Sequence, residues 1–476
     1  MKLLRNRRVR RIAIVVALLG VIGVVVAAVL WFNVRKEGEA RLARVCAELD
    51  ATDPGWRMAE LEATHNASVA PPGQNACEQA LAAARLITPE IRRYQLGARW
   101  AGELELPHTP HPDDLASLRE SLDEAEPALQ LARNLYRCTG GGIRFEYRDL
   151  EFWVLDWLDQ LRKTEALLDF ATILTAADGR TDESLKLARS IIALDRGVGG
   201  EPLMISQAVR MKMLMTAVRS TERTLAWCSN ATDEELALVQ SELLIAASAP
   251  RLRIARRSER AYQLRVLESL ESRVATQRLG YGSLRAGERV QLVCQHNHWP
   301  GQQAEMLELM TRLVEATDRS YPEQLRICNG VWAAAKAAYK DPSKAPMSKF
   351  SYGGFSSEHP LLELDARSVG ALRVAATAVA SERFRLKHGR LPTTLSELTP
   401  DFLTAVPADP YTGKPLQFQR TEFGVVVYMT RADGADDGEV NLDEKDEKGG
   451  NIGFRLFDPT HRRQPPLPKP DPDRDE

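Results

Sequence analysis

The densest group of side chains suited to chemistry is an acidic segment at residues 433–448, where eight carboxylates stand against two lysines. Such crowding of like charge is costly unless water, salt or a divalent cation neutralises it. Calcium takes about six to eight oxygen ligands, which carboxylates and amides supply. The segment therefore predicts a calcium site, with a merely solvated acidic turn as the alternative. The predicted ligands are Asp433, Asp436, Asp437, Asn441 and Asp443.

Four histidines form two close pairs, His108 with His111 and His296 with His298. Imidazole is a common zinc ligand, so four such groups could hold a metal if the pairs converged. No H-E-x-x-H pattern is present, and the spacing gives no indication that the two pairs meet. Exposed histidines in loops are the simpler interpretation.

Two carboxylates, Asp156 and Asp159, stand three residues apart in a helical pattern and project from one helix face. Glycosidases use two carboxylates about 5–10 Å apart on opposite sides of the scissile bond, normally from different elements. A solvated acidic stripe beside a Trp and Leu core face therefore explains this pair more simply than catalysis does.

A run of arginines follows in the second half of the long helical region, at positions 251, 253, 256, 257, 260 and 265, with Glu259 among them. Arg253, Arg257 and Arg260 share a helix face, which could hold an anionic lipid or polymer. Pairing with acidic segments elsewhere in the chain is the favoured alternative.

Sequence patterns of common catalytic sites are missing. The chain contains no G-x-S-x-G, no G-x-x-x-x-G-K-[ST], no G-x-G-x-x-G after a strand and no kinase loop set. No residue is therefore predicted to be catalytic or to bind an organic cofactor, and we expect a protein that is not an enzyme.

An apolar run of 21 residues without a charge, 12–32, is the clearest signal in the sequence. A helix of this length spans roughly 30 Å, the thickness of the hydrocarbon core of a bilayer. The run is longer than a typical signal-peptide core and lacks a small-residue cleavage site, so an uncleaved anchor is favoured over a signal peptide or a buried helix. Six basic residues precede it, which predicts a cytoplasmic N-terminus and an extracytoplasmic body.

The net charge and the number of cysteines limit the functions and the covalent structure that can be expected. The net charge is −2, and six basic residues in the first eleven leave the rest of the chain at −8. Nucleic-acid binding draws on cationic contacts, so it is not expected. Six cysteines permit disulfides outside the cytoplasm, but the sequence selects no pairing, and buried thiols are equally compatible with it.

Apolar residues at three- and four-residue spacing predict a mainly α fold from residue 33 to 339: helices over 115–135, 150–174, 182–194, 202–225 and 233–245. Asp182 and Thr232 stand where N-caps belong, and Gly179 and Gly197 where helices end. An irregular helical domain is favoured over a repeat array. The expected organisation is a basic tail at 1–11, a transmembrane helix at 12–32, an all-α extracytoplasmic domain at 33–339, a linker at 340–360, a small α+β module at 361–460 and a disordered tail at 461–476.

Within the last module, the spacing predicts a helix over 361–388 that ends at Gly389, a capping box from Thr394 to Glu397, and a hairpin of 416–420 with 425–430. The stretches FRLKHGRLPTTLSEL (384–398), AVPADPYTGKPL (405–416) and VYMTRADGADDG (427–438) resemble the C-terminal part of major (G-type) pseudopilins of type II secretion. As a whole, the chain resembles large bacterial membrane proteins that end in this module.

The resemblance implies a long helix on a small antiparallel sheet and a calcium-binding acidic loop. It covers roughly 370–455, and residues 1–32 contain no pseudopilin processing site. The expected function is therefore a scaffold or binding protein in the inner membrane of the bacterial cell envelope, with other envelope proteins as candidate partners. The alternatives are an envelope hydrolase that uses carboxylates or a His-bound metal, and an accessory component of a secretion or pilus machine.

Overall fold

The computed structural model describes residues 7–97, 99–102, 104–144, 146, 154–275, 298–340, 358–430, 432 and 451–468. These residues are mainly helical and contain one three-stranded sheet. They divide into two compact units, each considered by itself. Unit 1 comprises 1–58, 257–315 and 327–358, and unit 2 comprises 59–256, 316–326 and 359–476. Unit 2 thus combines part of the expected all-α region with the expected C-terminal module.

Unit 1 contains α1 (Arg7–Thr52), the helix that carries the apolar run. An 18-residue stretch within Ile14–Thr52 has a mean hydropathy of 3.0, and none of it is buried. Large apolar side chains between Ile14 and Phe32 are exposed. The helix is therefore long and apolar enough to cross a membrane.

Beyond the apolar run, α1 continues without a break as a packed helix. Val45 is buried, and the backbone of Gly38 meets Gly301 of α13 (Trp299–Ala316) so closely that a Cβ on Gly38 would lie 2.7 Å from the Gly301 nitrogen. Arg41 Nε donates to Glu308 Oε1 at 3.0 Å. The candidate anchor and the first packed helix of unit 1 are therefore one element.

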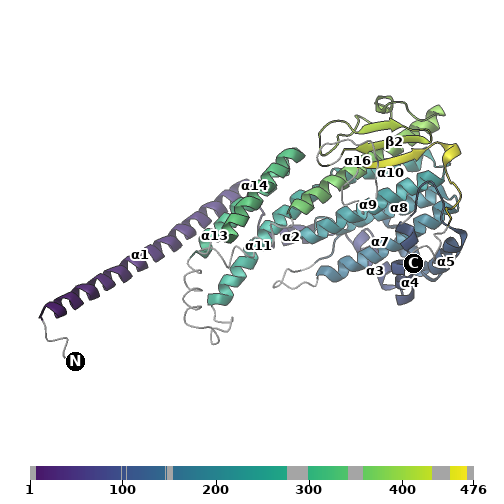
Figure 1. Cartoon of the computed structure of the whole chain (residues 1–476). Coiled ribbons are helices and arrows are strands. Elements are labelled where there is room, and N and C mark those ends of the chain that lie inside the picture. Colours follow the sequence, from purple (N-terminus) through teal and green to yellow (C-terminus); the bar gives the residue numbers. More distant parts are fainter. Residues whose placement is uncertain are drawn as a thin grey trace, which may run out of the picture. The chain divides into compact units, whose positions relative to one another are not determined.

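Unit 2 is built on a layer of helices in which α7 (Val154–Ala177), α8 (Thr181–Val198) and α9 (Met204–Trp227) lie side by side (Figure 1). Helix α8 is the most enclosed of the three, because most of its residues are buried between its neighbours. The remaining helices of this region are α2 (Met58–Ser68), α3 (Ala76–Arg85), α4 (Pro89–Gly97), α5 (Pro112–Glu124), α6 (Glu126–Ala132), α10 (Asp233–Ala247) and the start of α11 (Arg251–Ala275). Short 3₁₀ turns at Arg99–Gly102 (η2) and Leu135–Arg137 (η3) complete it.

The expected helix over 115–135 is interrupted at Ala125, which ends α5 and begins α6. Pro127 explains the break, since proline is tolerated in the first turn of a helix but not in its interior. Of the two predicted glycine stops, Gly179 (φ +76°) follows α7 as expected, whereas Gly197 lies inside α8 and Gly199 (φ +60°) is the C-cap.

The predicted N-cap at Thr232 is confirmed, because its hydroxyl accepts a hydrogen bond from Glu235 N at 3.3 Å. The N-cap prediction for Asp182 is wrong, since this residue lies in the first turn of α8. Its carboxylate instead accepts hydrogen bonds from Thr232 N at 3.0 Å and Thr232 Oγ1 at 2.9 Å. Asp182 thus ties the start of α8 to the start of α10.

The C-terminal part of unit 2 follows the predicted element order. Helix α16 (Glu358–His388) is followed by Gly389 (φ +72°), and the capping box of Thr394 and Glu397 opens the 3₁₀ turn Leu395–Leu398 (η5). Strands β1 (Gln417–Arg420), β2 (Gly424–Met429) and β3 (Ile452–Phe457) form an antiparallel sheet in the order β1-β2-β3. The predicted hairpin is therefore confirmed, with Gln417 opposite Tyr428 and Arg420 opposite Val425.

A buried carboxylate fixes the turn that leads into this sheet. Asp409 is fully buried and accepts hydrogen bonds from Tyr411 N at 2.8 Å, Thr430 N at 3.0 Å and Thr430 Oγ1 at 2.7 Å. Each carboxylate oxygen thereby has a donor, which offsets the cost of burying the charge. Asp409 therefore joins the segment ahead of β1 to Thr430 at the end of β2.

The start of the expected disordered tail is a packed segment, so that prediction is wrong for 461–468; residues 469–476 lie outside the described residues. Arg462 is buried and forms a two-bond ion pair with buried Glu382 of α16, at 2.7 and 2.9 Å. Gln464 N donates to Pro107 O at 3.0 Å after the turn Pro459–His461 (η6). The buried ion pair and the backbone hydrogen bond therefore order this segment, although its Pro-rich composition predicts disorder.

Candidate functional site

The predicted calcium ligands Asp433, Asp436, Asp437, Asn441 and Asp443 lie outside the described residues. Their segment connects β2 to β3, whose adjacent ends Met429 and Ile452 are paired. The sheet thus holds together the described strand ends on either side of the acidic segment.

The histidine pairs are only partly described, because His296 lies outside the described residues. His108 Nδ1 lies 2.7 Å from Pro465 O, and His111 caps α5 by accepting from Asp113 N. His298 lies at the start of α13 in unit 1. Within the described ranges, no group of three or more His, Cys, Asp or Glu side chains is placed to hold a metal ion.

The pair Asp156 and Asp159 lies on the exposed face of α7, while neighbouring Trp157 and Leu158 are buried. Asp159 forms an ion pair with Lys163 one turn away at 2.9 Å. This is the solvated acidic stripe that the sequence favours.

The arginine run makes internal ion pairs, as the favoured interpretation predicts. In unit 2, buried Arg251 contacts Asp195 at 2.8 Å, and Arg253 contacts Asp318 at 2.8 Å. In unit 1, Arg257 and Arg260 share Asp53. These four side chains therefore hold the fold together and are not a free cationic face.

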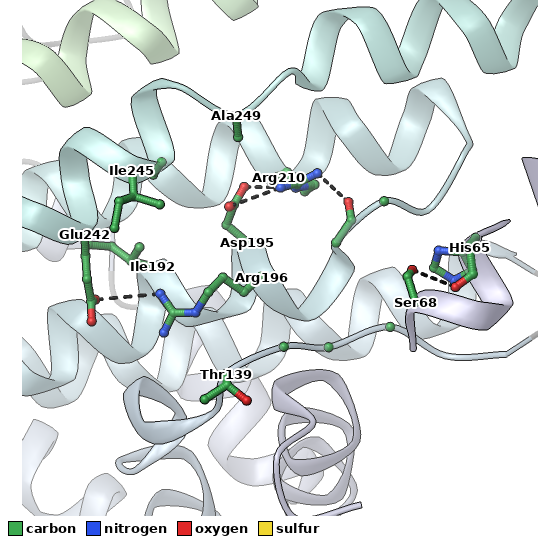
Figure 2. Close-up of a pocket in the computed structure, with 16 residues that line it drawn as sticks. His65, Ser68, Thr139, Ile192, Asp195, Arg196, Arg210, Glu242, Ile245 and Ala249 are labelled. Atoms are coloured by element: carbon green, nitrogen blue, oxygen red, sulfur yellow. Dashed lines mark hydrogen bonds and ion pairs between the residues drawn. The ribbon is translucent and has the colours of Figure 1, made fainter. Parts of the chain in front are cut away.

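A cavity of about 360 Å³ in unit 2 is the strongest candidate for a binding site (Figure 2). Its walls come from α2, α8, α9, α10 and the glycine segment 140–142. Backbones approach closely at this segment, since a Cβ on Gly141 would lie 2.3 Å from the Cα of Gly197, and Gly142 N donates to Gly197 O at 2.7 Å. Only glycine at position 141 allows this wall to form.

The central polar group of the cavity is Asp195, held by two arginines. Arg210 Nε donates to Asp195 Oδ1 at 2.9 Å, and Arg251 Nε donates to the same oxygen at 2.8 Å. Burial would raise the pKa of Asp195, but the two guanidinium groups outweigh it and hold the pKa at about 2. Arg251 Nη1 is buried and has no hydrogen-bond partner among the described residues. Asp195 is thus a structural anion that stays charged at neutral pH.

One end of the cavity carries a looser pair, Arg196 and Glu242 (Figure 2). Glu242 Oε1 accepts from Arg189 Nη2 at 3.0 Å. Glu242 Oε2 is buried and accepts no hydrogen bond from the described residues, and the Arg196 Nη1 atom lies 3.8 Å from it. Since a buried acceptor without a donor costs free energy, this oxygen is suited to accept a hydrogen bond from a ligand.

His65 and Ser68 stand at the other end (Figure 2), and Ile192, Ile245 and Ala246 supply apolar parts of the wall. His65 Nε2 lies 2.9 Å from Ile143 O. Burial lowers the pKa of His65, although this contact and one to the Gly200 backbone oppose the shift. A mixed apolar and polar cavity of this size suits a small molecule, at the low end of the usual range for ligand pockets of about 300–1,000 Å³.

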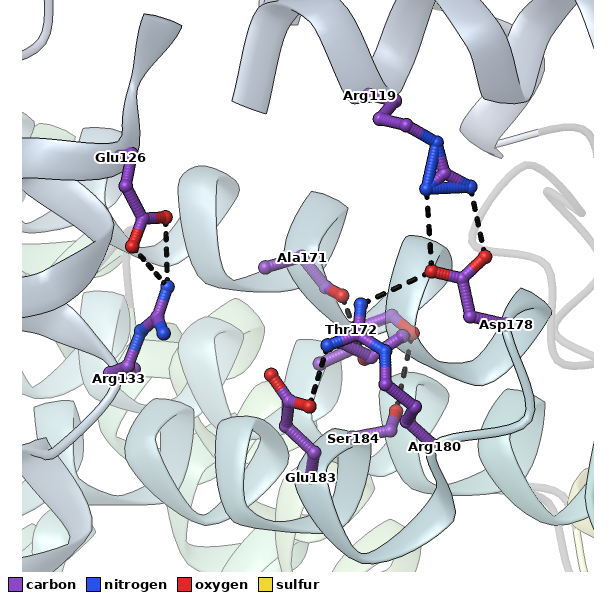
Figure 3. A network of polar contacts seen from close by, with 10 residues as sticks. Arg119, Glu126, Arg133, Ala171, Thr172, Asp178, Arg180, Glu183 and Ser184 are labelled. Carbon is purple, nitrogen blue, oxygen red and sulfur yellow. Dashed lines mark hydrogen bonds and ion pairs between the residues drawn. The ribbon is translucent and has the colours of Figure 1, made fainter. Parts of the chain in front are cut away.

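A second polar network in unit 2 is structural (Figure 3). Arg119 of α5 and Arg180 both bind Asp178, at 2.9 and 3.1 Å, and Arg180 continues to Glu183 at 2.6 Å. The side chains are partly exposed, and their ion pairs fix α5 to the turn between α7 and α8.

Sequence reasoning identified Arg251 but missed Asp195, Arg210 and Glu242. These residues come from different helices, and each by itself resembles an ordinary surface charge in the sequence. The run Gly140–Gly142 forms a wall of the cavity, and no motif in the sequence indicates this role. The five described cysteines, Cys46, Cys77, Cys138, Cys228 and Cys328, are free thiols, and Cys294 lies outside the described residues.

The chain is thus mainly helical, with one N-terminal helix able to cross a membrane and a small three-stranded sheet. No protein-family model, curated protein or solved structure matches it.

Proposed function

We propose that the chain is a membrane-anchored, non-enzymatic binding or scaffold protein of the bacterial cell envelope. The observation that carries this proposal is the exposed apolar run of α1, which continues directly into packed helix. Exposed apolar surface of this length is costly in water and favourable in a bilayer. The cavity of unit 2 then supplies a place where a protein fixed at the membrane could bind a small ligand.

The test is membrane extraction of the full-length chain. We expect it to stay in the membrane pellet after high salt and alkaline carbonate, and to be released only by detergent. A variant with Val21→Glu, Val24→Glu and Val25→Glu should leave the membrane, because charges at the bilayer centre are costly. Release of the wild-type chain by carbonate alone would overturn the proposal.

The absence of catalysis is tested separately on the same purified chain. Turnover of glycans, peptides or phosphoesters that one substitution at Asp156, Asp159 or His298 abolishes would favour the hydrolase alternative. Co-purification with pseudopilins or a secretin from gently solubilised membranes would favour the accessory of a secretion machine.

We also propose that the acidic segment 433–448 between β2 and β3 binds calcium, supported by its eight carboxylates and by the pairing of the strand ends on either side of it. Calcium at millimolar concentration should raise the melting temperature of the full-length chain, because a ligand that binds the folded state stabilises it. The paired substitution Asp433→Asn with Asp437→Asn should remove the increase. An unchanged melting temperature from chelator to calcium would leave the segment a solvated turn.

A further inference from the structure

A second cavity of unit 2, of about 270 Å³, lies where α7, α9, β3 and residues 101–102 and 104–106 meet. Three arginines line it, Arg219, Arg223 and Arg455, together with two acids, Asp169 and Glu222. The guanidinium groups outnumber the carboxylates by one. The cavity shares no lining residue with the one in Figure 2.

The three guanidinium groups retain unused hydrogen-bonding capacity. Arg219 is exposed, and no carboxylate in the described part of the chain lies within ion-pair distance of it; its contact is Thr216 Oγ1 at 3.4 Å. Arg223 is buried and donates through Nη2 to Asp169 Oδ1 and Thr172 Oγ1, yet its Nε has no hydrogen-bond partner among the residues that the structure describes. A buried N–H of a cation without an acceptor is costly, so an incoming anion would remove that cost.

The two acids are already engaged. Glu222 is buried and accepts from Arg455 N at 2.8 Å, whereas Arg455 Nε lies at the longer distance of 3.4 Å. Burial raises the pKa of Glu222, against the opposing effect of Arg455. Asp169 accepts from Ser220 Oγ at 2.7 Å as well as from Arg223. Neither of these acids pairs with Arg219. Glu165 of α7 also interacts with Arg219, but burial raises the pKa of Glu165 to about 7, so this carboxyl is only partly charged at neutral pH and the cavity still favours one negative charge.

The rest of the wall is apolar: Ala101, Leu104 and Leu106 on one side and Phe170 of α7 on another. Burying apolar groups of a ligand against such a wall is favourable, by about 25 cal/mol for each Å² removed from water. A free phosphate ion has no apolar part and would gain nothing from this wall. A carboxylate, by contrast, matches the planar fork of a guanidinium and can be joined to an apolar body.

We propose that this cavity binds a small monocarboxylate with a short apolar chain, its carboxylate on Arg219, Arg223 and Arg455 and its chain against Leu104, Leu106 and Phe170. The site is independent of the membrane anchor, so it stands or falls separately from the proposed function.

The test uses the full-length chain in lipid nanodiscs and isothermal titration with hexanoate, hexan-1-ol and inorganic phosphate, with empty nanodiscs as the blank. We expect saturable binding of one hexanoate per chain, at least tenfold tighter than either hexanol or phosphate. Equal binding of hexanol would show an apolar pocket only, equal or tighter binding of phosphate would show a general anion site, and absence of hexanoate binding would show no site. Each of these results overturns the proposal.

Substitutions locate the binding. Arg219→Gln and Arg455→Gln remove guanidinium groups that are not fully buried, so both chains should fold, which circular dichroism would check. Arg137→Gln makes the same charge change on an exposed arginine of unit 2 outside the cavity. Loss of at least tenfold in hexanoate affinity in either cavity variant, with Arg137→Gln unchanged, supports the site. Wild-type affinity in both cavity variants, or an equal loss in Arg137→Gln, overturns it.

Discussion

The side chains that matter most in unit 2 are charged residues buried against one another. Asp195 of α8 accepts hydrogen bonds from Arg210 of α9 and Arg251 at the start of α11, so one carboxylate connects three helices. A buried ionic group of this kind adds little to the stability of the fold compared with well-packed apolar residues in its place. Removal of one charged partner is nevertheless costly, because the others are left buried and unpaired.

We therefore expect Asp195→Asn to destabilise the chain by about 3–5 kcal/mol, because both guanidinium groups would lose their counter-ion. Asp178→Asn is the matched control: its partners Arg119 and Arg180 are partly exposed, and such pairs are worth about 1 kcal/mol or less. Urea unfolding of the two variants at neutral pH measures both. Equal losses in the free energy of unfolding would mean that Asp195 does not stabilise the three helices that it connects.

The same residue predicts a pH dependence. The pKa of Asp195 is lowered to about 2 in the folded chain, from 3.8 in the unfolded one. Its contribution to stability is therefore fully present above about pH 4 and is lost as the pH falls toward 2. Asp195→Asn should have a shallower loss of stability over pH 4 to 2 than the wild type, and parallel curves would contradict this assignment.

At this scale the sequence indicated which residues are charged but not which of them meet. The partners Asp195 and Arg251 are 56 positions apart, and Glu242 and His65 lie at opposite ends of one cavity although 177 positions separate them. Periodicity reports which face of a helix is apolar. It carries no information about which polar side chain of one helix faces another.

Helix ends, turns and hairpins were easier to predict than contacts between distant side chains, because neighbouring residues in the sequence determine them. The capping box at Thr394, the stop at Gly389 and the hairpin of β1 and β2 follow from residues within a few positions of one another. Gly199 replaced Gly197 as the stop of α8, because Gly197 is used for close packing against Gly141. The order of the tail at 461–468 was missed because it depends on contacts with residues distant in the sequence, the ion pair of Arg462 with Glu382 and the backbone hydrogen bond of Gln464 with Pro107 among them.

That ion pair gives a prediction for the tail. Arg462→Ala removes the bonds to Glu382, Phe457 O and Cys228 O and should cost about 3 kcal/mol, since a buried partner is lost. Glu382 keeps Arg385 at 2.8 Å, so the chain should still fold. Limited proteolysis with trypsin should then cleave after Arg463 faster than in the wild type.

Lys387→Ala provides the control, because it breaks an exposed pair with Asp401 near the same helix end. Its rate of cleavage after Arg463 should match that of the wild type. If the Arg462 variant also matches the wild type, the tail does not depend on this ion pair.

The contact of α1 with α13 gives a prediction at the same scale. Gly38→Ala would place a Cβ 2.7 Å from the Gly301 nitrogen, so the two helices must separate, at a cost of about 1–3 kcal/mol. Hydrogen exchange in residues 33–52 and in α13 should become faster.

Gly330→Ala tests whether any Gly to Ala change in unit 1 has this effect. Its Cβ would meet only Arg312 Nη2, at an ordinary 3.8 Å, and alanine favours a helix by about 1 kcal/mol over glycine. Exchange should be unchanged or slower. Faster exchange in both variants would remove close packing as the explanation.

For the whole molecule, the decisive feature is that α1 runs without interruption from residue 7 to residue 52. The apolar run and the packed segment that follows share one hydrogen-bonded backbone, so a membrane that holds the first part also fixes the direction in which the second part leaves it. The side of the membrane is then set by the charges that flank the run, of which six basic residues precede it and Arg35 and Lys36 follow it.

We expect a reporter enzyme that is active only outside the cytoplasm to be active when fused after Glu476. Replacing all six basic residues of 1–11 by Gln should leave Arg35, Lys36 and their neighbours as the more basic flank, so a substantial fraction of chains should insert in the opposite orientation and reporter activity should fall. Replacing only Arg35 and Lys36 by Gln strengthens the original bias and should leave the activity unchanged. An inactive reporter on the wild-type chain would place the body of the protein in the cytoplasm. Reduced cysteines are the normal state there, so the free thiols of the described cysteines would need no protection. In an oxidising compartment, by contrast, burial would be needed to keep them reduced.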